Sequence, residues 1–211
     1  MRVLFIIFII LGCRKSQPET ASNMTKSIKT QIMLLEIPFG SDPDLRAKEG
    51  AAQWLLSNAA ESYPILLERL KSNTASPAII ELLPRFNRKE SIPFLEKLLK
   101  EHDQIAFIAG QALAQHHGQE SREALRRTVR EGESDAMIAA IEGLLTMNNT
   151  TDCSEFLIAA KNADEIVRYH AIRAAWHLKC LTDLQLKEIR NNDSSESVRI
   201  LATELISRKY K

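Results

Sequence analysis

The sequence predicts an all-α protein, an α-α superhelix in which about five two-helix repeats stack side by side between capping helices. The first observation is a set of anchor positions separated by 28, 30, 31, 31 and 31 residues: Ala47, Ala75, Ile105, Ala136, Val167 and Val198. The second is one central leucine in the later part of each of the first five units: Leu66, Leu95, Leu125, Leu157 and Leu186. A period near 31 residues with two helices per unit is typical of an α-solenoid.

The first helix of each unit is predicted from the residues that follow the anchors. Four positions later stand Ala51, Ile79, Ala109, Ala140, Ala171 and Ala202. Eight positions later stand Leu55, Leu83, Leu113, Leu144, Ala175 and Ile206. Offsets of four and eight share one helical face, and small residues there let neighbouring helices approach closely.

The second helix of each unit is predicted from residues that can cap a helix. Four positions before each central leucine stand Ser62, Ser91, Ser121, Cys153 and Thr182. Serine and threonine accept hydrogen bonds from the free N–H groups of a first turn. Pro64 and Pro93 would fall in that turn, where a missing N–H costs nothing, and Thr182 with Gln185 has the pattern of a capping box.

Two segments carry a resemblance to a known family. IVRYHA (166–171) and SVRILA (197–202) resemble the first helix of HEAT repeats, a group of armadillo-type helical repeats. The resemblance implies a HEAT-like solenoid in a domain of residues 44–211, with residues 24–43 as an N-terminal capping helix and turn. It also implies that the second helices line the concave face. The fold leaves the function open, because such arrays serve many roles.

The N-terminus has the features of an export signal. Residues 3–12 are an uncharged run behind Arg2; as a helix it would reach about 15 Å, half of the ~30 Å hydrocarbon core. The run fits the apolar region of a secretory signal; the alternative is a buried strand. Ile10-Leu11-Gly12-Cys13 resembles the bacterial lipobox, which implies cleavage before Cys13 and a covalent lipid on its thiol.

Residues 1–12 are therefore predicted to be a lipoprotein signal peptide and residues 13–23 a flexible tether. The covalent lipid on Cys13 would anchor the protein to a bacterial membrane. Arg14 stands where an Asp would resemble an inner-membrane retention signal, which favours the outer membrane. The body would then lie in the periplasm or at the cell surface.

Charge and motifs exclude several functions. Without residues 1–12, whose one charged side chain is Arg2, the 28 basic residues become 27 and equal the 27 acidic ones. Nucleic-acid binders usually carry a basic excess, so no nucleic-acid partner is predicted. No phosphate loop, nucleophile elbow or zinc-protease motif occurs. His116 and His117 would lie in a turn, distant from His177, so no metal site, cofactor or catalytic residue is predicted.

Two sets of residues remain as candidate sites. Once Cys13 of the three cysteines is lipidated, Cys153 and Cys180 remain, and an even number in an exported protein permits one disulfide. They would lie on the same edge of the solenoid; the alternative is that Cys153 replaces serine in a cap. Four exposed cations of the second helices could form a partner-binding patch: Lys97, Lys100, Arg127 and Arg130. The alternative is that they are cations near helix C-termini, where they are favoured.

The function expected from these observations is a non-enzymatic, membrane-anchored protein-binding scaffold or assembly factor of the bacterial cell envelope. The oligomeric state and the partner protein are left open. The rival hypothesis is a cytoplasmic HEAT-like enzyme, similar to bilin lyases or to HEAT-like DNA-repair proteins. That rival requires the N-terminal segment not to be a signal.

Overall fold

The computed structural model describes residues 21–38, 42–101, 104–147 and 153–208, which hold twelve α-helices, two 3₁₀ turns and no strand. The all-α prediction is confirmed. The first helices are α2 (Asp42–Ser57), α4 (Pro77–Leu82) with η1 (Leu83–Phe86), α6 (Gln104–Gln115), α8 (Ser134–Thr146), α10 (Glu165–His177) and α12 (Glu196–Arg208). The second helices are α3 (Ala59–Lys71), α5 (Ile92–Leu98) after η2 (Lys89–Ser91), α7 (Gln119–Glu131), α9 (Ser154–Ala159) and α11 (Asp183–Asn192).

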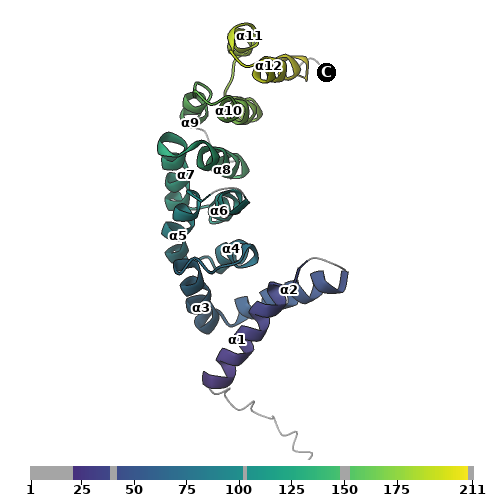
Figure 1. Ribbon diagram of the computed structural model, residues 1–211, viewed down its shortest axis with the longest axis vertical. Coiled ribbons are helices and arrows are strands. Elements are labelled where there is room, and N and C mark those ends of the chain that lie inside the picture. Colours follow the sequence, from purple (N-terminus) through teal and green to yellow (C-terminus); the bar gives the residue numbers. More distant parts are fainter. Residues whose placement is uncertain (1–20, 39–41, 102–103, 148–152, 209–211) are drawn as a thin grey trace, which may run out of the picture.

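These helices form two rows that run the length of the molecule (Figure 1). The first helices make one row and the second helices make the other. The double row is bowed, so that the first helices lie on its inner, concave side and the second helices on its outer, convex side (Figure 1). The expectation that the second helices line the concave face is therefore wrong for this chain.

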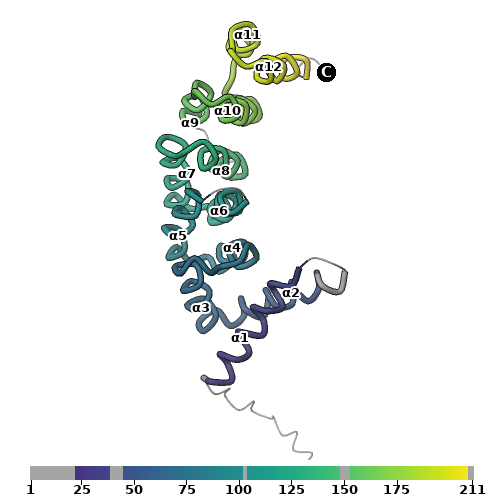
Figure 2. The backbone as a smooth tube through the Cα atoms, in the orientation of Figure 1, coloured from purple at the N-terminus to yellow at the C-terminus, as the bar shows by residue number. Residues whose placement is uncertain are grey.

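The helix α1 (Ala21–Leu35) packs against α2 and closes the N-terminal end of the array (Figure 2). Its buried residues Ile28, Ile32 and Leu35 face the array. The helix begins at Ala21, so residues 21–23 are helical and do not belong to the tether as predicted. Seven residues, about two turns, separate Ala21 from Ile28, so the helix extends beyond its buried stripe.

The first-helix ladder is buried as predicted. All six side chains at offset four are 0–1% exposed, from Ala51 to Ala202. At offset eight the five residues from Leu55 to Ala175 are 0–1% exposed. The sixth, Ile206, is only half-buried, because the described part of α12 has no further unit packed beyond it.

The second-helix ladder holds in four units and shifts in one. Leu66, Leu95, Leu125 and Leu186 are 0–1% exposed. In α9 the buried residue is Phe156, which is 1% exposed, whereas Leu157 is only half-buried. One residue along a helix is a rotation of about 100°, so the prediction for Leu157 is wrong by one position.

The capping box of α11 is confirmed. The Thr182 side chain accepts from the backbone N–H of Gln185, and the Gln185 side chain in turn accepts from the backbone N–H of Thr182. Cys153 occupies the N-cap position of α9 without a capping hydrogen bond. Pro64 lies inside α3, five residues after its start, and not in the first turn.

The prediction that serines cap the second helices is wrong. Ser62 and Ser121 lie inside α3 and α7, and Ser91 takes the N-cap position of α5 without a capping bond. All three are 0% exposed. Each hydroxyl donates to a carbonyl before it in the chain; the Ser62 hydroxyl, for example, lies 2.6 Å from the carbonyl oxygen of Leu55. These serines therefore satisfy backbone acceptors at the turn between the two helices of a unit.

The helices α6 and α8 approach closely at two glycines. A Cβ atom placed on Gly110 would lie 2.5 Å from the carbonyl oxygen of Ala139, and one on Gly143 would lie 2.7 Å from that of Gly110. Only glycine fits at such distances without a backbone shift. The two helices thus touch backbone to backbone in the middle of the row of first helices.

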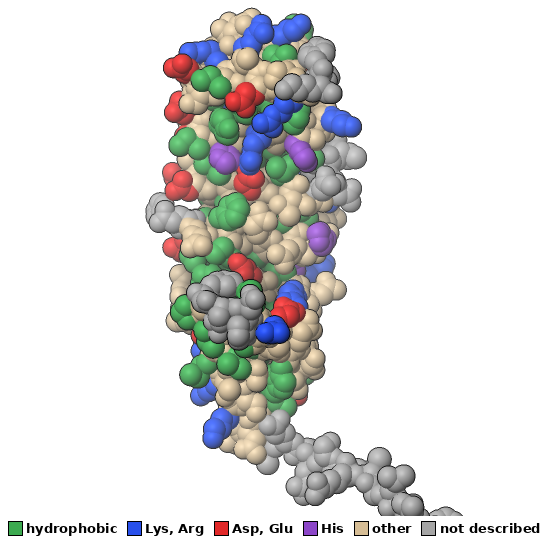
Figure 3. All heavy atoms as spheres, turned by 90° about the vertical axis from the view of Figure 1, so that its right-hand side faces the viewer, with side chains coloured by type: hydrophobic (Ala, Val, Ile, Leu, Met, Phe, Trp, Pro, Cys, Tyr) green, Lys and Arg blue, Asp and Glu red, His purple; other side chains and the backbone are tan. Residues whose placement is uncertain are grey.

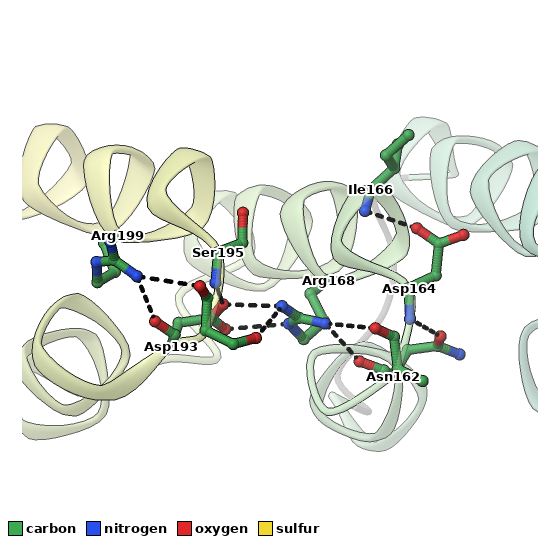
Figure 4. Close-up of polar contacts among 9 residues, drawn as sticks. Asn162, Asp164, Ile166, Arg168, Asp193, Ser195 and Arg199 are labelled. Atoms are coloured by element: carbon green, nitrogen blue, oxygen red, sulfur yellow. Dashed lines mark hydrogen bonds and ion pairs between the residues drawn. The ribbon is translucent and has the colours of Figure 1, made fainter.

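A buried arginine ties the last two units together (Figure 4). The Arg168 side chain on α10 is 10% exposed and donates to both carboxylate oxygens of Asp193, at 3.0 and 2.9 Å. It also donates to the carbonyl oxygens of Asn162 and Ala163, at 2.9 and 2.8 Å. Hydrogen bonds from Arg168 hold the pKa of Asp193 below its ordinary value, although partial burial acts in the opposite direction.

Replacing Gly110 by alanine is expected to lower the free energy of unfolding by about 1–3 kcal/mol, because the added methyl group forces α6 away from α8. The matched control is Gly50→Ala in α2, where an added Cβ meets no atom within 4 Å. At that exposed position alanine should stabilise the helix by about 0.5–1 kcal/mol. Urea unfolding followed by circular dichroism measures both, and equal effects of the two substitutions would contradict the close approach.

Replacing Arg168 by alanine is expected to cost about 3–5 kcal/mol, because it leaves the partly buried Asp193 carboxylate without its cation. Arg199, half-buried, donates to the backbone carbonyls of Asp193 and Ser194, so Arg199→Ala should cost only about 1 kcal/mol. Because the folded pKa of Asp193 is depressed, its contribution is present above about pH 4 and is lost as the pH falls further. Thermal unfolding from pH 7 to pH 3 should show that acid-dependent loss to be smaller in Arg168→Ala.

Candidate partner-binding face

The four cations predicted as a binding patch lie on the outer row. Lys97 belongs to α5, Lys100 follows it, and Arg127 and Arg130 belong to α7; all four side chains are exposed. Because the second helices form the convex side (Figure 1), these residues do not face the inside of the bow. The patch is not part of a concave surface.

Two of these cations are neutralised by carboxylates of neighbouring second helices. Arg127 donates to both carboxylate oxygens of Glu96, at 2.7 and 3.0 Å. Arg130 lies 3.0 Å from the carboxylate of Glu155, whose side chain is 5% exposed. Each pair joins one second helix to the next. These two arginines therefore serve contacts within the array.

The structure brings the two predicted cysteines together. Cys153 at the start of α9 and Cys180 after α10 form a disulfide, with their Cα atoms 5.7 Å apart. The bond joins the fourth unit to the fifth on one edge of the array. Cys13, the predicted lipid attachment site, lies outside the described residues.

A row of exposed apolar side chains runs along the first helices. Phe107, Tyr169 and Ile200 are 47%, 36% and 52% exposed, and Ile138 is half-buried. They come from four successive first helices, α6, α8, α10 and α12. We call these four residues the inner row. Figure 3 looks onto this side of the molecule, where hydrophobic side chains lie among polar ones.

The inner row follows from the same repeat that builds the core. Its members stand two positions after the anchors Ile105, Ala136, Val167 and Val198. An offset of two residues is a rotation of about 200° from the first anchor and also from the buried offset-four residue, so it faces away from the core. The sequence shows these residues as a third regularly spaced set, two positions after each of the last four anchors. The pattern of buried residues alone does not indicate them.

A polar cluster lies beside the inner row between α8 and α10. The His170 Nδ1 atom is 2.7 Å from a carboxylate oxygen of Glu142, and Arg173 forms an ion pair with the same carboxylate. Burial raises the pKa of Glu142, but the hydrogen bonds from His170 and Arg173 lower it by more, so that it lies below its ordinary value. Histidine and cationic side chains gather in the corresponding upper half of the face in Figure 3.

A groove of about 500 Å³ continues this face between α10 and α12. Tyr169, Trp176 and His177 line one side, and Glu204 and Arg208 line the other. Aromatic rings beside cations and a carboxylate suit a protein segment with both apolar and charged groups. The groove therefore extends the inner row toward the C-terminal end of the array.

One pair of described side chains resembles a piece of catalytic machinery. A Ser91–His116 pair, with Oγ and Nε2 3.0 Å apart, resembles part of a nucleophilic dyad. Ser91 is 0% exposed, however, and its hydroxyl also donates to the carbonyl of Arg88. Within the described residues no group of three histidine, cysteine, aspartate or glutamate side chains is arranged to hold a metal ion.

Comparison of the chain with protein-family models and with curated proteins gives no match. Among the described helices, none combines the length and the apolar character needed to cross a bilayer.

Proposed function

We propose that the chain is a non-enzymatic, protein-binding scaffold or assembly factor of the bacterial cell envelope, held to a membrane by a lipid on Cys13. The first helices bind the partner, and the second helices support them. The observation that supports this most is the inner row, Phe107, Ile138, Tyr169 and Ile200.

The inner row favours a protein partner because its members are large, apolar and aligned. Neighbouring packed helices are about 8–10 Å apart, so four of them extend the row over about 30 Å. Scattered exposed apolar residues need no explanation, whereas these four recur at one repeat position on four successive first helices, which aligns them along one side of the molecule. Aromatic side chains such as Phe107 and Tyr169 are enriched in the cores of such surfaces.

The disulfide between Cys153 and Cys180 supports export. Disulfides persist in oxidising compartments such as the bacterial periplasm and are rare in the cytosol. This observation favours the envelope over the cytoplasmic enzymes considered as the rival. It agrees with the lipobox-like Ile10-Leu11-Gly12-Cys13, which is the basis for the anchor.

The anchor is tested by metabolic labelling with a clickable fatty acid. The wild-type protein should carry the label and Cys13→Ala should not, because the thiol is the attachment atom. In membrane fractions of the same cells, the wild-type protein should be found at the length of the cleaved chain, and Cys13→Ala should not. Label on neither protein would contradict the anchor and would favour the rival hypothesis of a cytoplasmic enzyme.

The binding face is tested by site-specific photo-crosslinking in living cells. A photoreactive amino acid at Phe107 or Ile200 should crosslink to a discrete partner protein, because both side chains lie on the proposed contact surface. The matched control is Leu184 on α11, which is 77% exposed but belongs to the outer row.

Introducing charge at the face gives the corresponding functional readout. Phe107→Asp with Tyr169→Asp should lower the yield of the Ile200 crosslink about tenfold or more while the melting temperature stays within a few degrees, because both side chains are exposed. Crosslinks of equal yield at Leu184 and Ile200, or an unchanged Ile200 crosslink in the double variant, would contradict the inner row as the binding face.

A further inference from the structure

The charge of the chain is unevenly divided between its anchored end and its body. Residues 14–35 contain four basic side chains and one acidic side chain, Glu19, for a formal charge of +3. Residues 36–211 hold the remaining 23 basic and 26 acidic side chains, for a formal charge of −3. The proposed mature chain is thus neutral as a whole, but its end next to Cys13 is cationic.

Two of the four cations lie on the outer face of α1. Lys26 and Lys29 are exposed, and Met33, one turn further, is 70% exposed. Positions 26, 29 and 33 share one side of a helix, turned by roughly 110° from the mean direction of the buried Ile28 and Ile32. Among the described residues neither lysine forms an ion pair, and α1 itself contains no acidic residue.

Acidic groups near the other end of α1 do not cancel this charge. Glu36, which follows the helix, forms an ion pair with Arg69 of α3 at 3.0 Å. The buried residues of α1 lie on another side of the helix, toward the array. The outer face therefore combines two ammonium groups with one exposed thioether and faces away from the rest of the protein.

The predicted anchor places this face close to a bilayer. Eight residue steps separate Cys13 from Ala21, the first residue of α1, so the helix starts within about 28 Å of the lipidated cysteine. The helix is 15 residues, or about 22 Å, long. A lipid on Cys13 therefore keeps Lys26 and Lys29 at a high effective concentration near the headgroups.

We propose that the outer face of α1 lies on an anionic phospholipid surface, with Lys26 and Lys29 at the headgroups and Met33 at the interface. The proposal rests on the anchor of the proposed function and adds the orientation of the protein. Cations near such a surface are attracted by roughly 1 kcal/mol each, about a fivefold change in occupancy. The negatively charged body is repelled from the same surface, so the array extends away from the membrane.

The test uses the lipidated protein added to preformed vesicles of phosphatidylcholine alone or with one third phosphatidylglycerol. A water-soluble amine reagent modifies exposed lysines, and mass spectrometry gives the rate at each position. Lys26 and Lys29 should react about fivefold more slowly on the anionic vesicles, and the protection should disappear at high salt, where screening is complete within a few ångströms. Lys161 and Lys187, exposed in the C-terminal half, should react at the same rate on both.

Matched variants separate the lysines from net charge. In Lys26→Gln/Lys29→Gln, Met33 should be oxidised by a membrane-impermeant oxidant several-fold faster on anionic vesicles than in the wild type. The variant Lys161→Gln/Lys187→Gln removes the same charge far from α1 and should leave Met33 protected. Equal effects of the two variants would overturn the proposal.

The outcomes distinguish the proposal from the anchor on which it rests. Flotation with phosphatidylcholine vesicles reports the lipid anchor alone. Flotation with equal lysine rates on both kinds of vesicle means that the anchor holds and the docked face does not. Absence of flotation on neutral vesicles overturns the anchor, and the salt-sensitive protection of Lys26 and Lys29 on anionic vesicles then decides the docked face by itself.

Discussion

The backbone contact between α6 and α8 is the constraint on which the shape of the array depends. Gly110 and Gly143 leave no room for a side chain between these helices, and five of the six first helices carry a buried alanine four positions after the anchor. The second helices bury leucine or phenylalanine at their central position, and the distance between packed helices grows with the side chains at the contact. The row of first helices is therefore the shorter one, and the array bends toward it (Figure 1).

This bend decides what each surface of the protein offers. On the inner side the outward side chains of successive first helices converge, and the large apolar members, such as Phe107 and Tyr169, line one concave strip. On the outer side the long charged side chains diverge and reach one another between neighbouring helices, as Arg127 does to Glu96 and Arg130 to Glu155. Small residues in the core thus determine indirectly where apolar side chains are exposed.

The sequence was sufficient for the helices and the buried positions, because a single repeat period determines both. It was insufficient in α9: Cys153 takes the N-cap position four residues before Leu157, as Thr182 does before Leu186, yet Phe156 and not Leu157 is the buried residue. The prediction for the serines was wrong because the same hydroxyl can cap a helix or donate to a carbonyl. Ser62 donates to a carbonyl, and it lies inside a helix that begins three residues earlier. Whether the four cations lie on the concave or the convex side depends on the direction in which the array bends. That direction follows from the spacing of the packed helices, which the repeat period alone does not give.

The disulfide between Cys153 and Cys180 has a consequence for how the array comes apart. In a linear array each unit contacts only its neighbours, so the ends fray before the middle, and the last helices enclose a small core of their own made of Ile172, Leu186, Val198, Leu201 and Leu205. Fraying from that end releases α11 and α12 and then meets the covalent link that holds α10 to α9. Amide hydrogen exchange should therefore fall in one step at Cys180, with α11 and α12 as one fast-exchanging unit, and the exposed apolar strip loses only Ile200 of α12 while the remainder stays folded.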